Sequence, residues 1–83
     1  MNIEILTPEK KLFSDEVYGA QLPGINGKFE VLDKHAPMVS ALGKGTIKVL
    51  LNKTETQSFD ISGGFAEVLN NKLSVLVEGA VEV

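Results

Sequence analysis

Short runs of alternating apolar and polar residues, each ended by a turn signal, recur through all 83 residues. Runs of this kind with a turn about every 8 to 12 residues are typical of sandwiches and barrels, and no segment has the length of an organising helix. We therefore predict an all-β protein, a small two-sheet β-sandwich or flattened barrel of about 8 to 10 short strands. The clearest turn signals are Thr7-Pro8, Gly43-Lys44-Gly45, residues 52–55, Gly63-Gly64 and Asn70-Asn71.

The alternation places the strands. They are predicted at residues 2–6, about 15–22, 46–51, 56–62, 65–69 and 72–77. Val17 is out of phase with Ala20 and Leu22, which predicts a bulge near Gly19. Residues 22–42 are predicted to form an irregular, ordered segment between strands, with a polar tip at Asp33-Lys34-His35 that suits recognition.

Composition limits the classes of function. An apolar fraction of 43% with 23% charged residues is that of a folded protein, and we predict one domain over residues 1–83 with no membrane span. Because a domain this small buries little surface, its stability alone is expected to be modest, and a partner would help. The chain has no cysteine, and a net charge of −3 without a basic cluster argues against nucleic acid.

Three superficial motifs do not predict chemistry. His35 with Asp33 and Ser40 lacks the rigid scaffold and oxyanion hole of a catalytic triad, so a backbone or partner hydrogen bond is the better role for His35. The segment Gly43-Lys44-Gly45-Thr46 lacks the upstream glycine and following helix of a phosphate loop. One histidine without cysteine gives no metal set. We therefore predict no catalytic residue, no metal and no cofactor.

Four leucines are out of phase with the inward positions of their strands: Leu6, Leu50, Leu69 and Leu76. Single surface leucines are ordinary. Several on neighbouring strands indicate an apolar patch, and a patch of that kind indicates docking on a partner.

A carrier domain is the alternative function. Small all-β lipoyl and biotinyl domains present one lysine on a hairpin tip, and Lys34 could serve as the attachment site. His35-Ala36-Pro37 would disturb a tight hairpin at that position, and the chain has no internal repeat to match the twofold pseudosymmetry of such domains.

The chain also resembles a known family. Four segments, in the order of the family, are similar to the ε subunit of bacterial F-type ATP synthases, whose mitochondrial counterpart is the δ subunit. They are Thr7-Pro8-Glu9-Lys10-Lys11-Leu12-Phe13-Ser14, Leu22-Pro23-Gly24-x-x-Gly27-x-Phe29-x-Val31-Leu32-x-x-His35-Ala36-Pro37-Met38-Val39-Ser40-Ala41-Leu42, Gly63-Gly64-Phe65-Ala66-Glu67-Val68 and Asn71-Lys72-Leu73-Ser74-Val75-Leu76.

This resemblance implies a β-sandwich that acts as a non-catalytic rotor subunit of the central stalk. The implied partners are the γ subunit and the ring of c subunits, with the α and β subunits in the assembled complex. The implied place is the cytoplasmic face of the bacterial inner membrane, with membrane association only through the complex. The two-helix C-terminal domain of many relatives is not encoded in residues 1–83, so we expect this polypeptide neither to bind ATP nor to adopt an extended inhibitory state.

Contact residues can be assigned within this resemblance. We expect γ to cover the leucine patch of Leu6, Leu50, Leu69 and Leu76. We expect the loop tips at one end of the sandwich to meet the short polar loops of the c ring, with Asn26, Lys28, Asp33, Lys34 and His35 as the contacts. The chain departs from the family at Asp33-Lys34, where many relatives have Pro-Gly, and at Lys28, where some relatives are acidic.

Overall fold

A computed structural model describes residues 1–83 and contains ten strands and no helix. The protein therefore has no helix that could cross a bilayer. The strands are β1 (Asn2–Leu6), β2 (Lys11–Glu16), β3 (Gly19–Gly24), β4 (Gly27–Leu32), β5 (Met38–Leu42), β6 (Gly45–Leu50), β7 (Thr56–Ile61), β8 (Gly64–Leu69), β9 (Lys72–Val77) and β10 (Ala80–Glu82). The predicted all-β fold is confirmed.

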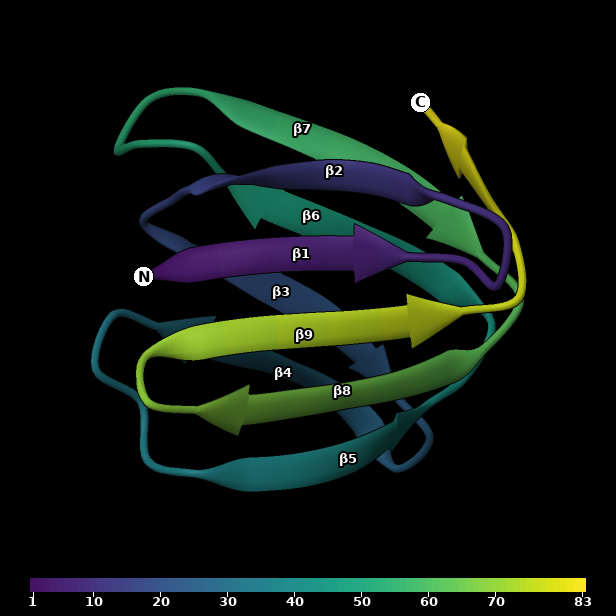
Figure 1. Ribbon diagram of the computed structural model, residues 1–83, viewed down its shortest axis with the longest axis horizontal. Helices are drawn as coiled ribbons and strands as arrows, with labels where there is room; N and C mark the ends of the chain where they lie inside the picture. Colours follow the sequence, from purple (N-terminus) through teal and green to yellow (C-terminus); the bar gives the residue numbers. More distant parts are fainter.

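The strands lie in two layers (Figure 1). The first layer has the order β5-β8-β9-β1-β2, and the second has β10-β7-β6-β3 with β4 paired to β3. One bridge, from Gly24 to Leu42, joins β3 to β5 and makes the sheet continuous from layer to layer. All pairings are antiparallel except that of β1 with β9, which places the N-terminal strand between β9 and β2.

The core lies between the layers and holds no polar side chain. It consists of 17 buried hydrophobic residues, and Phe13 of β2 lies edge-on to Phe59 of β7, with ring centroids 5.9 Å apart. The predicted inward positions Ile3, Ile5 and Ile47 are fully buried. Burial of apolar surface contributes about 25 cal/mol per Å² removed from water, so the side chains of the whole core supply most of the stabilisation of the folded state.

The predicted single strand over residues 15–22 is wrong. The chain forms β2 in the first layer, passes between layers at Val17 and Tyr18, and begins β3 in the second layer. The change of phase therefore marks a crossing instead of a bulge. Val17 is buried there, and its N–H donates to the carbonyl oxygen of Met1 at 2.8 Å.

Residues 22–42 are also more regular than predicted, since they contain the end of β3 and the whole of β4 and β5. Ile25 and Asn26 form the β3–β4 turn, with Gly24 paired to Gly27. The predicted turn at Asn70 and Asn71 is confirmed, because both residues have positive φ, 51° and 59°.

Strand β4 runs from one end of the sandwich to the other (Figure 1). We call the end near Met1 the N-terminal end. It holds residues 33–37 between β4 and β5 and the β8–β9 turn. The opposite end holds the turn of Ile25 and Asn26, and beside it the β5–β6 turn, where the Gly43 N–H donates to the Pro23 carbonyl oxygen at 2.8 Å.

Candidate docking face

An apolar row crosses the outer face of the first layer. Phe65 of β8 is paired with Leu76 of β9, and Leu76 is paired with Leu6 of β1. Phe65 is 61% exposed and Leu76 is 54% exposed, although both belong to strands whose alternate residues are buried. We call Leu6, Phe65 and Leu76 the apolar strip. A contiguous apolar strip on a small domain is characteristic of a docking site.

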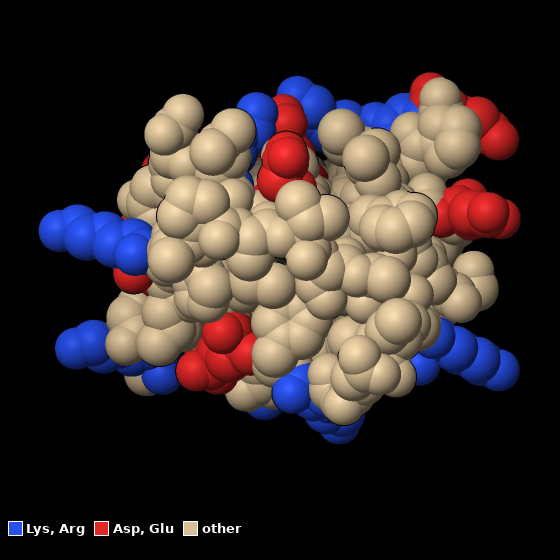
Figure 2. Space-filling view, turned by 90° about the horizontal axis from the view of Figure 1, so that it is seen from below, with Lys and Arg blue, Asp and Glu red and all other residues tan.

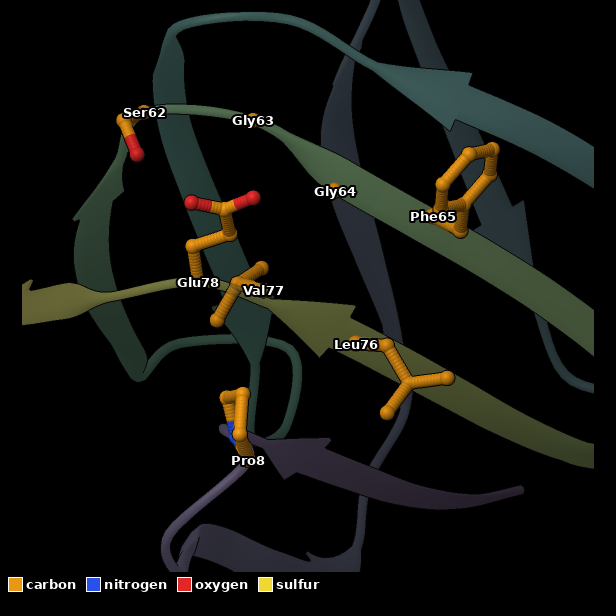
Figure 3. A pocket seen from close by; sticks show the side chains of 8 residues that line it. All are labelled: Pro8, Ser62, Gly63, Gly64, Phe65, Leu76, Val77 and Glu78. Atoms are coloured by element: carbon orange, nitrogen blue, oxygen red, sulfur yellow. The ribbon is translucent and has the colours of Figure 1, made fainter.

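A hollow of about 490 Å³ continues the strip toward the opposite end of the molecule (Figure 3). Pro8 from the β1–β2 turn, Leu76 from β9 and Phe65 from β8 surround it. The full lining is Pro8, Ser62, Gly63, Gly64, Phe65, Leu76, Val77 and Glu78. The strip therefore ends in a recess that could take a projecting apolar side chain.

A polar row borders the strip on the same face. Glu67, Ser74 and Glu4 are paired in register across β8, β9 and β1. The Glu4 carboxylate accepts from Lys72 at 2.9 Å and from Lys11 at 3.0 Å. These two bonds hold the pKa of Glu4 below its usual value, and the bond from Lys72 has the larger effect. An apolar centre beside a charged rim is the ordinary arrangement of a protein–protein interface.

The structure divides the four predicted leucines. Leu69 shares the outer face of β8 with Phe65 but lies at the N-terminal end, and it is 51% exposed. Leu50 is half-buried on β6, in the second layer, so the four leucines do not form one patch and Leu50 is not part of the strip. Sequence reasoning missed Phe65, although its alternation with the buried Ala66 and Val68 was a usable signal.

The structure also divides the predicted loop contacts. Asn26 and Lys28 lie at the opposite end, where β4 begins, whereas Asp33, Lys34 and His35 follow the last residue of β4. The expectation that both tips share one end is therefore wrong. A strand of six residues runs between them, so a flat partner surface at one end cannot meet both.

Asp33 is the centre of a polar cluster at the N-terminal end. Its Oδ1 accepts from the Met1 ammonium at 2.6 Å and from the Asn71 side-chain amide at 2.9 Å. The Asn71 side-chain oxygen in turn accepts from the Lys34 N–H at 2.7 Å. The bond that Asp33 accepts from the ammonium, and then the bond that it accepts from Asn71, lower the pKa of Asp33. The bond that the Met1 ammonium donates to Asp33 raises the pKa of the ammonium.

Replacing Asp33 with asparagine in a polypeptide with a free Met1 amino group should lower the thermal midpoint. The lowered pKa of Asp33 gives stability above its ordinary value of 3.8 that is lost as pH falls through the folded-state pKa. The raised pKa of the ammonium gives stability below 8.0 that is lost as pH rises through the folded-state pKa. Thermal melts of wild type and variant should therefore differ most between those two values and converge at both extremes.

Asp15→Asn is the matched control, since Asp15 accepts only from the neighbouring Glu16 N–H, at 2.8 Å. Its melting midpoint should stay close to that of wild type across the same range. A constant difference between wild type and Asp33→Asn at every pH would refute the ionic contribution of the cluster.

His35 and Lys34 have local roles. The His35 Nδ1 lies 2.7 Å from the Ala36 carbonyl oxygen, which confirms the predicted backbone hydrogen bond. Lys34 has a positive φ of 64° in the β4–β5 connection, and its N–H is bound to Asn71, so it is not on the free tip of a tight hairpin. No three His, Asp or Glu side chains gather in positions to hold a metal ion.

The chain is thus a small β-sandwich domain whose outer face has an apolar strip beside a charged rim, an arrangement found in protein–protein interfaces. The family described as "ATP synthase, Delta/Epsilon chain, beta-sandwich domain" matches residues 1–83. The chain is 42% identical to an ATP synthase epsilon chain of Chlorobaculum tepidum over 92% of this chain and 86% of that one. It is 44% identical to that of Caulobacter vibrioides over 99% and 94%. The chain therefore belongs to the ATP synthase delta/epsilon family.

Two solved structures share the fold. A chain of the Euglena gracilis mitochondrial ATP synthase, from an assembly of OSCP, F1 and c-ring, superposes with a TM-score of 0.89 at 23% identity, and the match covers 96% of this chain. A chain from the central stalk and c-ring of the Tetrahymena thermophila enzyme has a TM-score of 0.83 at 16% identity. The present chain covers 51% and 64% of those chains, respectively.

Proposed function

We propose that this chain is a non-catalytic rotor subunit of the central stalk of an F-type ATP synthase. Membership of the delta/epsilon family supports the class of complex. The apolar strip on the first layer is the observation that supports a role in docking. In this proposal the subunit couples rotation of the c ring, through the γ subunit, to synthesis or hydrolysis of ATP on other chains.

The γ subunit is the proposed occupant of the apolar strip. Leu6 and Leu76 remain from the predicted leucine set, Phe65 joins them, and Leu69 lies where the same face reaches the N-terminal end. Leu50 is left out because it lies on the other layer. The hollow beside Pro8 would receive a projecting side chain of γ.

The opposite end is the proposed contact with the c ring. Asn26 and Lys28 are exposed, and no side-chain hydrogen bond or ion pair holds either of them. Lys44 is exposed in the neighbouring turn. Asp33, in contrast, is already bound to the Met1 ammonium and to Asn71. Free polar groups favour the opposite end, because each exposed ion pair contributes only about 0 to 1 kcal/mol and several must share the load.

The mechanism is mechanical coupling by a stiff body between two contacts. The core is closely packed, and the antiparallel register fixes each outer side chain relative to the end loops. Torque entering at the loops would reach the strip without a hinge. The subunit would lie at the cytoplasmic face of the bacterial inner membrane, held there by the complex that also contains the α and β subunits.

Copurification tests the class of function. The tagged chain, expressed in its native cells, should recover γ, α, β and c subunits from detergent-solubilised membranes. A control chain with aspartate at Leu76 should recover less of all four. A wild-type chain that recovers none of them, or that carries lipoyl or biotin mass on Lys34, would overturn the proposal.

Cysteine crosslinking tests the orientation of the domain. A cysteine at Lys28 should crosslink to a cysteine in the polar loop of the c subunit in the assembled enzyme, and a cysteine at Lys34 should not, because the two positions lie at different ends of β4. Both side chains are exposed, which makes them a matched pair. Crosslinks from position 34 alone would invert the orientation. Crosslinks from both positions would contradict their placement at different ends of β4.

A further inference from the structure

Strand β5 has an edge that is only partly paired. On one side all five residues, Met38–Leu42, are in register with β8. On the other side its only strand partner is Gly24 of β3, opposite Leu42. Residues 38–41 of β5 therefore have no strand partner on the side away from β8.

Hydrogen bonds show which backbone groups face this edge. The Ala41 carbonyl oxygen accepts from the Ile25 N–H at 3.1 Å, and the Gly43 N–H donates to the Pro23 carbonyl oxygen at 2.8 Å. The backbone N–H and C=O groups of the odd-numbered residues of β5 therefore point away from β8. Because the direction alternates along a strand, the N–H and C=O of Val39 face the same side. Neither of these groups, nor the N–H of Ala41, has a backbone partner.

The strand itself is uncharged and has exposed apolar side chains, although Glu67 of β8 is paired with Val39. No residue of β5 is charged, Val39 is 72% exposed, and Ile25 is 65% exposed in the turn beside the strand. Figure 2, which views the molecule from the side where β5 lies, shows a broad uncharged surface with lysine and acidic side chains around its border. Exposed edges are usually protected by lysine, proline or a cover, and here Pro37 protects only the start of the strand.

A shallow hollow of about 220 Å³ connects this edge to the apolar strip. Val39 lies on one side of it, and Phe65 and Leu76 lie on the other. A partner that covers Phe65 therefore comes close to the free groups of Val39. The β5 edge continues the face already proposed for docking.

We propose that an extended, uncharged segment of the partner seated on the apolar strip adds as a strand to the edge of β5. This inference rests on the proposed function, in which that partner is the γ subunit. Free backbone donors and acceptors require a partner with the same groups in extended form, which is β-strand addition. The lack of charge on β5 selects a segment that is itself uncharged, and Val39 supplies the side-chain contact between strand and strip.

Amide hydrogen exchange in the γ complex measures the added hydrogen bonds directly. The N–H groups of Val39 and Ala41 should exchange rapidly in the isolated chain and slow by at least about tenfold in the complex. The Ser40 N–H faces β8, so it should be protected in both states and serves as the internal control. Unchanged exchange at Val39 and Ala41 in a formed complex would overturn the inference.

Val39→Pro removes the edge donor while keeping an apolar side chain. The fold should tolerate it, because the lost N–H faces away from the β5–β8 ladder and proline is accepted on edge strands. Val39→Ala keeps the N–H and shortens the side chain. We expect Val39→Pro to weaken γ binding by about tenfold more than Val39→Ala does, with thermal melts used to show that both variants fold.

The possible outcomes separate the inference from the function on which it rests. Equal affinities for the two variants, alongside normal wild-type binding, would overturn strand addition and leave the docking proposal intact. Failure of wild type to bind γ would overturn both. Protection of Val39 that rises with protein concentration without γ, together with a dimer in sedimentation, would assign the edge to a second copy and overturn the proposed occupant.

Discussion

Aspartate at both Phe65 and Leu76 is expected to weaken binding to the γ subunit by at least about 100-fold. The two side chains are paired within the apolar strip, and each substitution would place a carboxylate where γ removes water. Since both are more than half exposed in the isolated chain, the thermal midpoint should change little. The measurement is the affinity of each purified chain for assembled α, β and γ subunits.

Leu50→Asp is the matched control for this pair of changes. Like Phe65 and Leu76, Leu50 is out of phase with the buried residues of its strand. It lies on β6 in the second layer, away from the strip. Its affinity should stay within about twofold of wild type, the ordinary range for a surface residue outside an interface. Comparable losses from Leu50→Asp and from the double variant would mean that γ does not recognise the strip in particular.

Alanine at Gly64 is expected to destabilise the fold by about 2 to 5 kcal/mol. Gly64 has a φ of 158°, and a β-carbon there would overlap the Leu76 carbonyl oxygen and crowd Val77. The backbone of β8 cannot move away without loosening its pairing with β9. The total stability expected for a domain of this size is only about 4 to 12 kcal/mol, so denaturant unfolding should show a large loss.

Gly79→Ala is the matched control, because it makes the same glycine-to-alanine change at a position where the added β-carbon has no close neighbour. A β-carbon at Gly79 would meet no atom within 4 Å. The substitution should leave stability unchanged or raise it by about 0.4 to 1 kcal/mol, because alanine restricts the unfolded chain. If Gly64→Ala were as stable as Gly79→Ala, the close approach of β8 to β9 would not be needed for the fold.

Gly64 also connects the fold to the proposed site. It lines the hollow next to Phe65, and its lack of a side chain allows β8 and β9 to approach each other there. Relaxation of this contact would shift Phe65 relative to Leu76. We therefore expect any folded variant at Gly64 to lose some affinity for γ as well.

The inward positions and most turns could be predicted because they depend on local rules. Alternation alone identified Ile3, Ile5 and Ile47 as core residues, and all three are fully buried. Asn70 and Asn71 tolerate positive φ, and they form the turn that the sequence predicts. The resemblance carried by four segments, of which residues 22–42 are the longest, predicted the family, and the match over residues 1–83 confirms it.

The sequence by itself thus determined the all-β class, the inward face of most strands and the family. Only the tertiary structure decided that Leu76 and Leu50 lie on different layers, that Asn26 and Asp33 lie at different ends, and that Phe65 completes the strip. The physical reason is that the two-residue alternation along a strand determines only which side of its own strand a residue occupies. It does not state which strands pair, and pairings such as β1 with β9 join segments far apart in the chain.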